Sequence, residues 1–85
     1  MMQLPYNIKF LRDKSWKLKL LFILQCHFSH KQYFTLDEVY QVAVGSLQFF
    51  YPKNNTVTAS IRRNLEELRD DGCIQFVNYN GLYSW

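Results

Sequence analysis

The sequence is poor in the features that mark secreted, membrane-spanning or multidomain proteins. Its two cysteines, Cys26 and Cys73, lie far apart and follow no cleavable signal peptide, so we expect free thiols and a reducing cytoplasm. The longest apolar run, 20–24, is too short to cross a bilayer, and we expect no membrane contact. With 85 residues and no internal repeat, the chain has room for one hydrophobic core.

Signatures of catalysis and metal binding are also scarce. His27 and His30 are three residues apart, but neither cysteine stands at a metal-ligand spacing from them. There is no glycine-rich phosphate loop and no serine in a nucleophile elbow. We therefore expect no enzyme activity from this chain alone, no cofactor and no metal. A metal- or thiol-dependent enzyme, the alternative, requires both cysteines and both histidines to converge.

What remains is the composition of a small globular domain with a mild positive charge. Hydrophobic residues make up 48% and charged residues 20%, which excludes a disordered tail. Aromatic residues reach 18%, and each buried ring removes a large area from water. The net charge of +3 permits a nucleic-acid partner without requiring one. The location of the charged residues therefore decides whether nucleic acid is the expected partner.

The first half of the sequence predicts a lead-in and two helices. Residues 1–12 show no sustained period and are interpreted as an extended lead-in or linker stub before a domain over 13–85. Helical spacing of apolar residues predicts a helix over 15–28, capped by Asp13 or Ser15.

A second helix is predicted over 36–49. Thr35 and Glu38 match the capping-box pattern that begins a helix, and Tyr33 with Phe34 forms a short extended piece before it.

The second half predicts a third helix and a hairpin. The helix, over 56–71, follows a polar turn, ends at Gly72 and has an apolar stripe of Val57, Ile61, Leu65 and Leu68. Two strand-like segments, 73–78 and 82–85, flank Asn80-Gly81, which favours a two-residue turn. That register pairs Phe76 with Trp85 and Asn78 with Tyr83. It turns Ile74, Phe76, Tyr83 and Trp85 toward the helices and leaves Gln75, Tyr79 and Ser84 outside.

Three helices followed by a hairpin, with a short extended piece before the second helix, is the order of a winged helix-turn-helix. We therefore predict this α+β fold, with a C-terminal β-hairpin as the wing. A small α+β domain of another topology is the alternative. In a winged helix the third helix enters the major groove of DNA.

Charge on the third predicted helix is distributed in an order that favours DNA contact. Arg62 and Arg63 precede Glu66 and Glu67, which runs against the helix macrodipole and gives the weaker orientation of i to i+4 ion pairs. Stability alone does not select this order, whereas contact with a duplex does. The alternative is a solvated helix in which Arg62 pairs with Glu66 and Arg63 with Glu67.

We predict that DNA contacts come from this helix, the turn before it and the hairpin tip. Arginine and asparagine recognise guanine and adenine edges, whereas lysine, serine and threonine commonly hold phosphates. The predicted contact residues are Lys53, Asn54, Asn55, Thr56, Ala59, Ser60, Arg62, Arg63, Asn78, Tyr79 and Asn80. For the two turn asparagines the alternative is capping or turn formation, and for the tip it is a plain tight turn. A further basic cluster is expected to flank the duplex or to form a solvated face: Lys9, Arg12, Lys14, Lys17 and Lys19.

Residues along most of the chain resemble the C-terminal winged-helix domain of type II restriction endonucleases of the Dam-replacing and methyl-directed GATC-cleaving group. The matching residues are Trp16, Phe34-Thr35-Leu36, Val39-Tyr40, Tyr51-Pro52, Asn54, Ile61-Arg62, Leu65, Leu68-Arg69-Asp70, Gly72, Ile74, Phe76, Gly81 and Tyr83. The resemblance implies a module that binds double-stranded DNA, sensitive in some members to adenine methylation, attached to a PD-(D/E)xK nuclease domain.

No such nuclease motif occurs in this sequence, so we expect the chain to be a fragment or accessory piece of a restriction endonuclease. The alternative function is a winged helix that docks a nuclease or methyltransferase partner through its aromatic surface. The residues considered for that surface are Phe49, Phe50, Tyr51 and Tyr79.

Overall fold

The computed structural model describes residues 12–78 and 80–85, which form three helices and a three-stranded antiparallel sheet. In chain order the elements are α2 (Trp16–Phe28), β1 (Tyr33–Thr35), α3 (Leu36–Phe50), α4 (Val57–Asp70), β2 (Gln75–Asn78) and β3 (Leu82–Ser84). This order and topology confirm the predicted winged helix-turn-helix. Apart from Arg12, the lead-in predicted over 1–12 lies outside the described residues.

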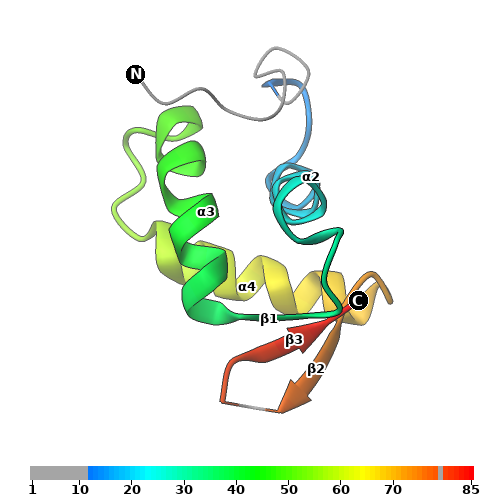
Figure 1. Cartoon of the computed structure of the whole chain (residues 1–85). Coiled ribbons are helices and arrows are strands. Elements are labelled where there is room, and N and C mark those ends of the chain that lie inside the picture. The colour runs from blue at the N-terminus through cyan, green and yellow to red at the C-terminus, as the bar shows by residue number, and fades with distance from the viewer. Residues whose placement is uncertain (1–11, 79) are drawn as a thin grey trace.

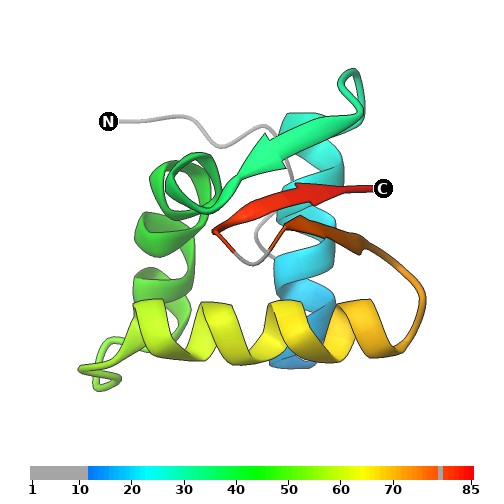
Figure 2. The same ribbon diagram turned by 90° about the horizontal axis from the view of Figure 1, so that it is seen from below.

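The three helices pack on one another around a single core. Figure 1 shows α4 passing beneath both α2 and α3, and Figure 2 shows the three strands side by side, with the hairpin of β2 and β3 next to α4. Within the described ranges, no helix is long and apolar enough to cross a membrane. The side chains with no exposed surface come from the helices and from β1: Leu20, Ile23, Leu24, Phe34, Val39, Ala43, Leu47, Ile61 and Leu65.

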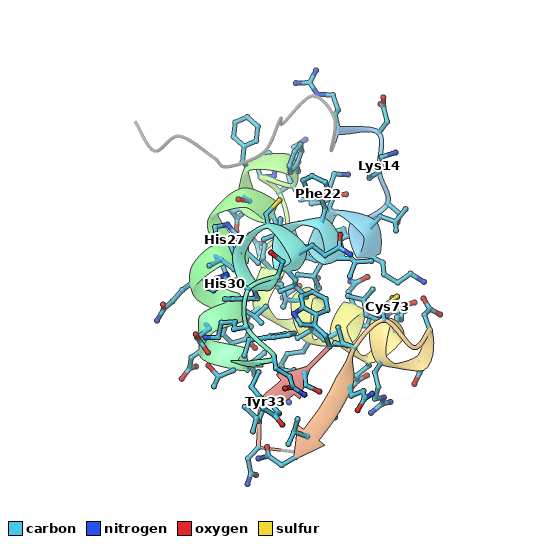
Figure 3. All side chains as sticks on the ribbon, turned by 45° about the vertical axis from the view of Figure 1, so that its right-hand side comes forward. Lys14, Phe22, His27, His30, Tyr33 and Cys73 are labelled. Atoms are coloured by element: carbon cyan, nitrogen blue, oxygen red, sulfur yellow. The ribbon has the colours of Figure 1, made fainter. Side chains whose placement is uncertain are left out.

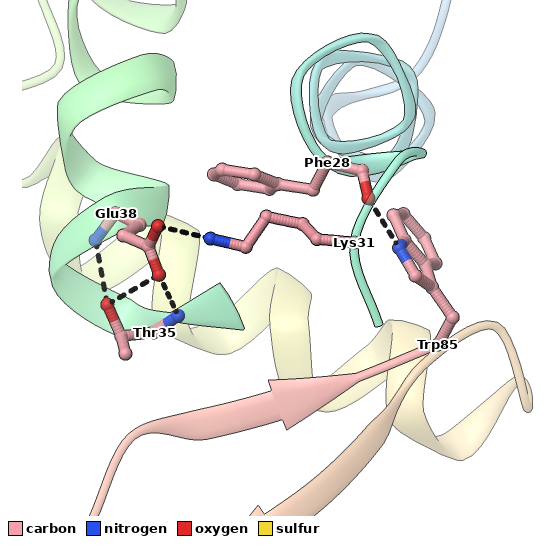
Figure 4. A network of polar contacts seen from close by, with 5 residues as sticks. All are labelled: Phe28, Lys31, Thr35, Glu38 and Trp85. Atoms are coloured by element: carbon pink, nitrogen blue, oxygen red, sulfur yellow. Dashed lines mark hydrogen bonds and ion pairs between the residues drawn. The ribbon is translucent and has the colours of Figure 1, made fainter. Parts of the chain in front are cut away.

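Side-chain caps begin the first two helices where the sequence indicates. Ser15, rather than Asp13, caps α2, since its Oγ accepts a hydrogen bond from the backbone N of Leu18 at 3.2 Å. At α3 the Thr35 Oγ1 accepts from the backbone N of Glu38, and a Glu38 carboxylate oxygen accepts from the backbone N of Thr35 (Figure 4). These two bonds form the predicted capping box, and they fix the angle at which the chain passes from β1 into α3.

The helix ends also follow the predicted signals closely. Helix α3 continues through Gly45 and ends at Phe50, one residue later than predicted. Helix α4 ends at Asp70, and Gly72 then takes the left-handed conformation with φ of +82°. The backbone N of Cys73 donates to the carbonyl of Leu68 at 2.9 Å, which satisfies one of the last carbonyls of the helix.

The hairpin exists, but its predicted register is wrong. Phe76 pairs with Tyr83 rather than with Trp85, and Asn78 pairs with Leu82 across a bulge. The Oδ1 atom of Asn78 accepts from the backbone N of Asn80 at 2.9 Å and of Leu82 at 3.3 Å. The turn therefore begins directly after Asn78, one residue earlier than predicted. A two-residue turn at Asn80-Gly81 requires a positive φ at both residues. Among the described residues only glycines have a positive φ, so Gly81, at +93°, meets this requirement and Asn80 does not.

The sheet has a third strand, because β1 pairs with β3 and makes β3 the central strand. Ser84, predicted to lie outside, is therefore buried between its neighbours Tyr33 and Gln75. Ile74 and Tyr83 are buried in the core as predicted, and the ring of Phe76 packs edge-on against Tyr83 at 4.9 Å.

An aromatic cluster joins the end of α2 to the sheet. The ring of Phe34 stacks on Phe28 at 5.1 Å and on Tyr83 at 5.9 Å, and it contacts Trp85 at 5.3 Å. The indole N–H of Trp85 donates to the carbonyl of Phe28 at 3.0 Å, near the end of α2 (Figure 4). These contacts fix the position of the hairpin relative to the helices.

The capping box predicts a pH-dependent part of the folding stability. Lys31 bonds the Glu38 carboxylate at 2.7 Å, and this bond, with the backbone N–H of Thr35, holds the pKa of Glu38 below its ordinary value of 4.5. A lowered pKa stabilises the fold above the ordinary value and loses that contribution as pH falls through the folded-state value. We expect Glu38→Gln to be less stable than the wild type at pH 7, with a difference that shrinks below pH 4.5 in urea titrations.

Asp37→Asn is the matched control, because Asp37 is an exposed acid in the same helical turn. A stability difference between wild type and Glu38→Gln that stays constant from pH 7 to pH 3 contradicts the assignment.

Candidate nucleic-acid interface

Burial of one side of α4 determines which residues face outward. Val57, Ile61, Leu65 and Leu68 are buried in the core, as predicted. Because a helix turns 100° per residue, the residues between them lie on the opposite side. Ala59, Arg62 and Arg63 are accordingly exposed, and Ser60 is half-buried at the flank. The N-terminal half of α4 therefore presents two guanidinium groups on its outer side.

These guanidinium groups are not engaged in ion pairs within residues 12–78 and 80–85. The ion pairs found there join Lys17 to Asp71, Lys31 to Glu38 and Arg69 to Asp70. The alternative pairs from Arg62 to Glu66 and from Arg63 to Glu67 do not occur. Lys53, in the turn before α4, is also exposed and outside these ion pairs. The turn and the first half of α4 thus form a cationic surface that is open to an anionic partner.

Asn54 acts as a turn former at the start of α4. Its Oδ1 accepts from the backbone N of Thr56 at 2.8 Å and from the Thr56 hydroxyl at 3.1 Å. Its Nδ2 donates to the Oγ of Ser60 at 3.3 Å. Because both the oxygen and the nitrogen of its amide are occupied, Asn54 forms the turn in this structure, as the alternative had it. Asn55 and Thr56 are exposed.

Two further amide side chains that the sequence analysis missed bond backbone carbonyls in or near this turn. Gln48 donates through Nε2 to the carbonyls of Tyr51 at 3.2 Å, Pro52 at 3.4 Å and Asn54 at 3.2 Å. Asn64 is 9% exposed and donates to the carbonyl of Ser60 at 2.8 Å. Gln48 of α3 therefore holds the loop between α3 and α4, whereas the bond of Asn64 lies within α4.

Lys19 departs from the exposed face predicted for the second basic cluster, whereas Arg12 and Lys14 are exposed. Lys19 is only 4% exposed, and its ammonium donates to the carbonyl of Lys14 and to the Tyr51 hydroxyl at 2.9 Å. It lies over the rings of Phe50 and Tyr51, at 5.2 and 5.1 Å from their centroids. Lys17 is paired with Asp71, and Lys9 lies outside the described residues.

The position of Lys19 in the sequence explains why it is buried. Its helical spacing from apolar residues was the signal that could have predicted this burial. It stands three residues after Trp16 and four before Ile23, within the apolar stripe of α2. Trp16 stacks on Tyr51 at 5.5 Å with an interplanar angle of 14°. Lys19 and Trp16 therefore fasten the end of α3, where the turn toward α4 begins.

The wing contributes a second set of polar groups beside α4. Asn78 and Asn80 are exposed, and Tyr79 lies outside the described residues. The Oδ1 of Asn78 is occupied by the turn, in agreement with the tight-turn alternative, but its amide nitrogen remains a donor. A hollow between α4 and the hairpin, which sequence reasoning missed, is lined by Arg62, Glu66, Phe76, Asn78, Gly81 and Tyr83.

The residues considered for metal or thiol chemistry do not converge. Figure 3 shows Cys73 well apart from His27 and His30, which lie at the end of α2. Within the described part of the chain, no three histidine, cysteine or acidic residues gather as metal ligands would. The candidate site is the outer side of α4 together with the wing.

The fold and this surface define a winged helix-turn-helix domain with an outward-facing cationic third helix. The sequence matches the Dam-replacing HTH domain family over residues 12–84, so the chain belongs to that family. It is thereby a DNA-binding helix-turn-helix module of the restriction-enzyme type, as the resemblance implied. None of the curated proteins compared with the sequence matches it.

The role of Asn54 can be tested by changing its two amide functions separately. Asn54→Ala removes the acceptor for the Thr56 N–H, and we expect a loss of about 1 kcal/mol in the free energy of unfolding. Asn54→Asp keeps that acceptor and adds an acid at a helix N-terminus, so its stability should remain close to that of the wild type. Chemical denaturation measures both variants, and equal losses would contradict the turn-forming role.

Proposed function

We propose that this domain binds duplex DNA with α4 in the major groove and its N-terminal half toward the base edges. The observation that carries the proposal is the pairing of a fully buried aliphatic stripe with two exposed arginines outside ion pairs on the same helix. Such a helix gains little stability from its arginines and retains their hydrogen-bonding capacity for a ligand. Residues 13–85 are proposed to form the binding unit.

Each residue of the surface has a role that its chemistry supports. Arg63 is proposed to read a guanine, since its fork matches the O6 and N7 acceptors, and Asn55 is the remaining amide for a base contact. Lys53, Thr56 and Ser60 are suited to phosphates at the N-terminus of α4, where the helix dipole favours anions. Asn78, Tyr79 and Asn80 of the wing are proposed to contact the adjacent strand.

Ala59 gives a physical basis for sensitivity to methylated bases. Its methyl group lies exposed between the arginines and the start of α4, and apolar contact with a small side chain is how methyl groups in the major groove are recognised. We propose that this contact favours N6-methyladenine in the site. Cleavage in such a system would belong to a separate nuclease domain or subunit.

Docking of a protein partner is the second candidate function. Phe49 at the end of α3 is 62% exposed and packs edge-on against Phe50 at 5.7 Å. Exposed aromatic side chains such as Phe49 are enriched at protein–protein interfaces, and the partner proposed for this surface is a nuclease or methyltransferase.

Removal of the two α4 arginines tests DNA binding directly. We expect Arg62→Ala/Arg63→Ala to lower duplex affinity by tenfold or more and to reduce the salt dependence, because fewer counterions are released. Fluorescence anisotropy titrations at several salt concentrations measure both. The matched control is Lys17→Ala/Lys31→Ala, which removes the same charge from residues engaged in ion pairs. Equal affinity and salt dependence in the arginine variant and the wild type would contradict the proposal and favour the docking function.

Methyl recognition is tested with duplexes selected from a randomised pool and prepared with adenine or N6-methyladenine. We expect the methylated duplex to bind more tightly, and Ala59→Ser to reduce the difference, because a hydroxyl replaces part of the apolar contact. Preference for the unmethylated duplex would contradict this role of Ala59.

A further inference from the structure

The hollow between α4 and the wing is lined by one guanidinium, one carboxylate and neutral polar and aromatic groups. It measures about 120 Å³ and opens beside the cationic half of α4 (Figure 2 shows the hairpin next to this helix). It is lined from α4 by Arg62 and Glu66, and from the hairpin by Phe76, Asn78, Gly81 and Tyr83. Two elements distant in sequence therefore place polar groups around one small space.

Asn78 supplies a donor whose orientation is fixed by the turn. Its side-chain oxygen accepts from two backbone N–H groups, those of Asn80 and Leu82, so the assignment of oxygen and nitrogen in the amide is determined. The Nδ2 group consequently has hydrogens to donate, and it has no hydrogen-bond acceptor among the described residues. A donor held in this way is preorganised for a ligand.

Tyr83 supplies a second donor from the wall of the hollow. Its ring is packed between Phe34 and Phe76, and only 6% of the residue is exposed. Burial, aided by Tyr40 and Glu66 and opposed by Arg62, raises the pKa of the hydroxyl above its ordinary value of 10.0. The hydroxyl therefore stays protonated at neutral pH and remains able to donate.

Arg62 adds a guanidinium, so residues with donor groups from both elements line one space next to the proposed DNA surface. We propose that this hollow holds one backbone phosphate of the bound duplex, with Arg62, Asn78 and Tyr83 as the donors. The inference rests on the proposed function and deepens it, since a phosphate gripped between helix and wing fixes the register of α4 in the groove. Arg62 then positions the domain, and base reading falls to Arg63.

Glu66 provides a sharp test of the ligand class. Its carboxylate lines the same hollow and repels a phosphate, so Glu66→Gln should bind duplexes more tightly by about the same factor whatever their sequence. If the hollow instead reads a base edge, the carboxylate accepts from a cytosine amino group. In that case Glu66→Gln weakens binding and relaxes the preference at one cytosine, which would overturn the phosphate assignment.

The decisive experiment combines two wing variants with a backbone scan. A tight-binding duplex is selected from a randomised pool, and single neutral methylphosphonates are placed along each strand. We expect Tyr83→Phe and Asn78→Asp each to lower affinity for the all-phosphate duplex about tenfold. At one phosphate position the neutral methylphosphonate should make the wild type and both variants bind with equal affinity, because the group that Tyr83 and Asn78 contact is no longer charged.

Matched controls separate the site from general effects. Tyr33→Phe makes the same change on an exposed tyrosine of β1, and Gln75→Glu adds the same charge at an exposed amide of β2 that has no proposed DNA contact. Asn78→Asp retains the acceptors of the turn, and thermal unfolding verifies the fold of each variant. If Tyr83→Phe and Asn78→Asp bind like their controls while Arg62→Ala/Arg63→Ala loses affinity, the phosphate site is wrong and the proposed function stands. If the arginine variant also binds normally, the proposed function itself fails.

Discussion

Burial of the aliphatic stripe on α4 is the constraint on which the rest of the structure depends. Ile61 and Leu65 have no exposed surface, and they pack where α4 meets α2 and α3. Rotation of α4 about its axis would expose these side chains to water and bury arginines. The free-energy cost of these changes is far larger than the stabilisation that a surface contact can provide. The orientation of Arg62 and Arg63 is thus a consequence of core packing, independent of any ligand.

Two smaller assemblies position what α4 presents. At its start, Gln48 and Asn54 hold the turn, and the buried Lys19 fastens the end of α3 through Tyr51. Beside it, the aromatic cluster around Phe34 ties β3 to the end of α2. Helix and wing are therefore held by separate contacts to one core, and the space between them is defined before a ligand arrives.

The sequence was most informative where a local pattern decides the structure. The capping box of Thr35 and Glu38, the stripe on α4 and the glycine at position 72 gave the helices within one residue and the order of the fold. These signals involve residues within one or two turns of each other, which explains their reliability.

Prediction failed where contacts distant in sequence or side-chain competition decide the outcome. The hairpin register depends on the Asn78 oxygen bonding two backbone N–H groups, which outweighs the preference of Asn-Gly for a shorter turn. Lys19 was counted with the surface charges because its partner Tyr51 is 32 residues away. The hollow beside α4 joins residues of a helix and a hairpin, and no single segment of sequence reveals it.

We propose above all that the outer side of α4 and the wing together contact duplex DNA. Titration of ¹⁵N-labelled protein with a selected duplex, followed by amide chemical shifts, tests it residue by residue. We expect the largest changes over 53–63 and around Asn78 and Asn80, with little change at Leu18 and Phe49. Changes concentrated at Leu18 and Phe49, with α4 and the wing unaffected, would contradict it.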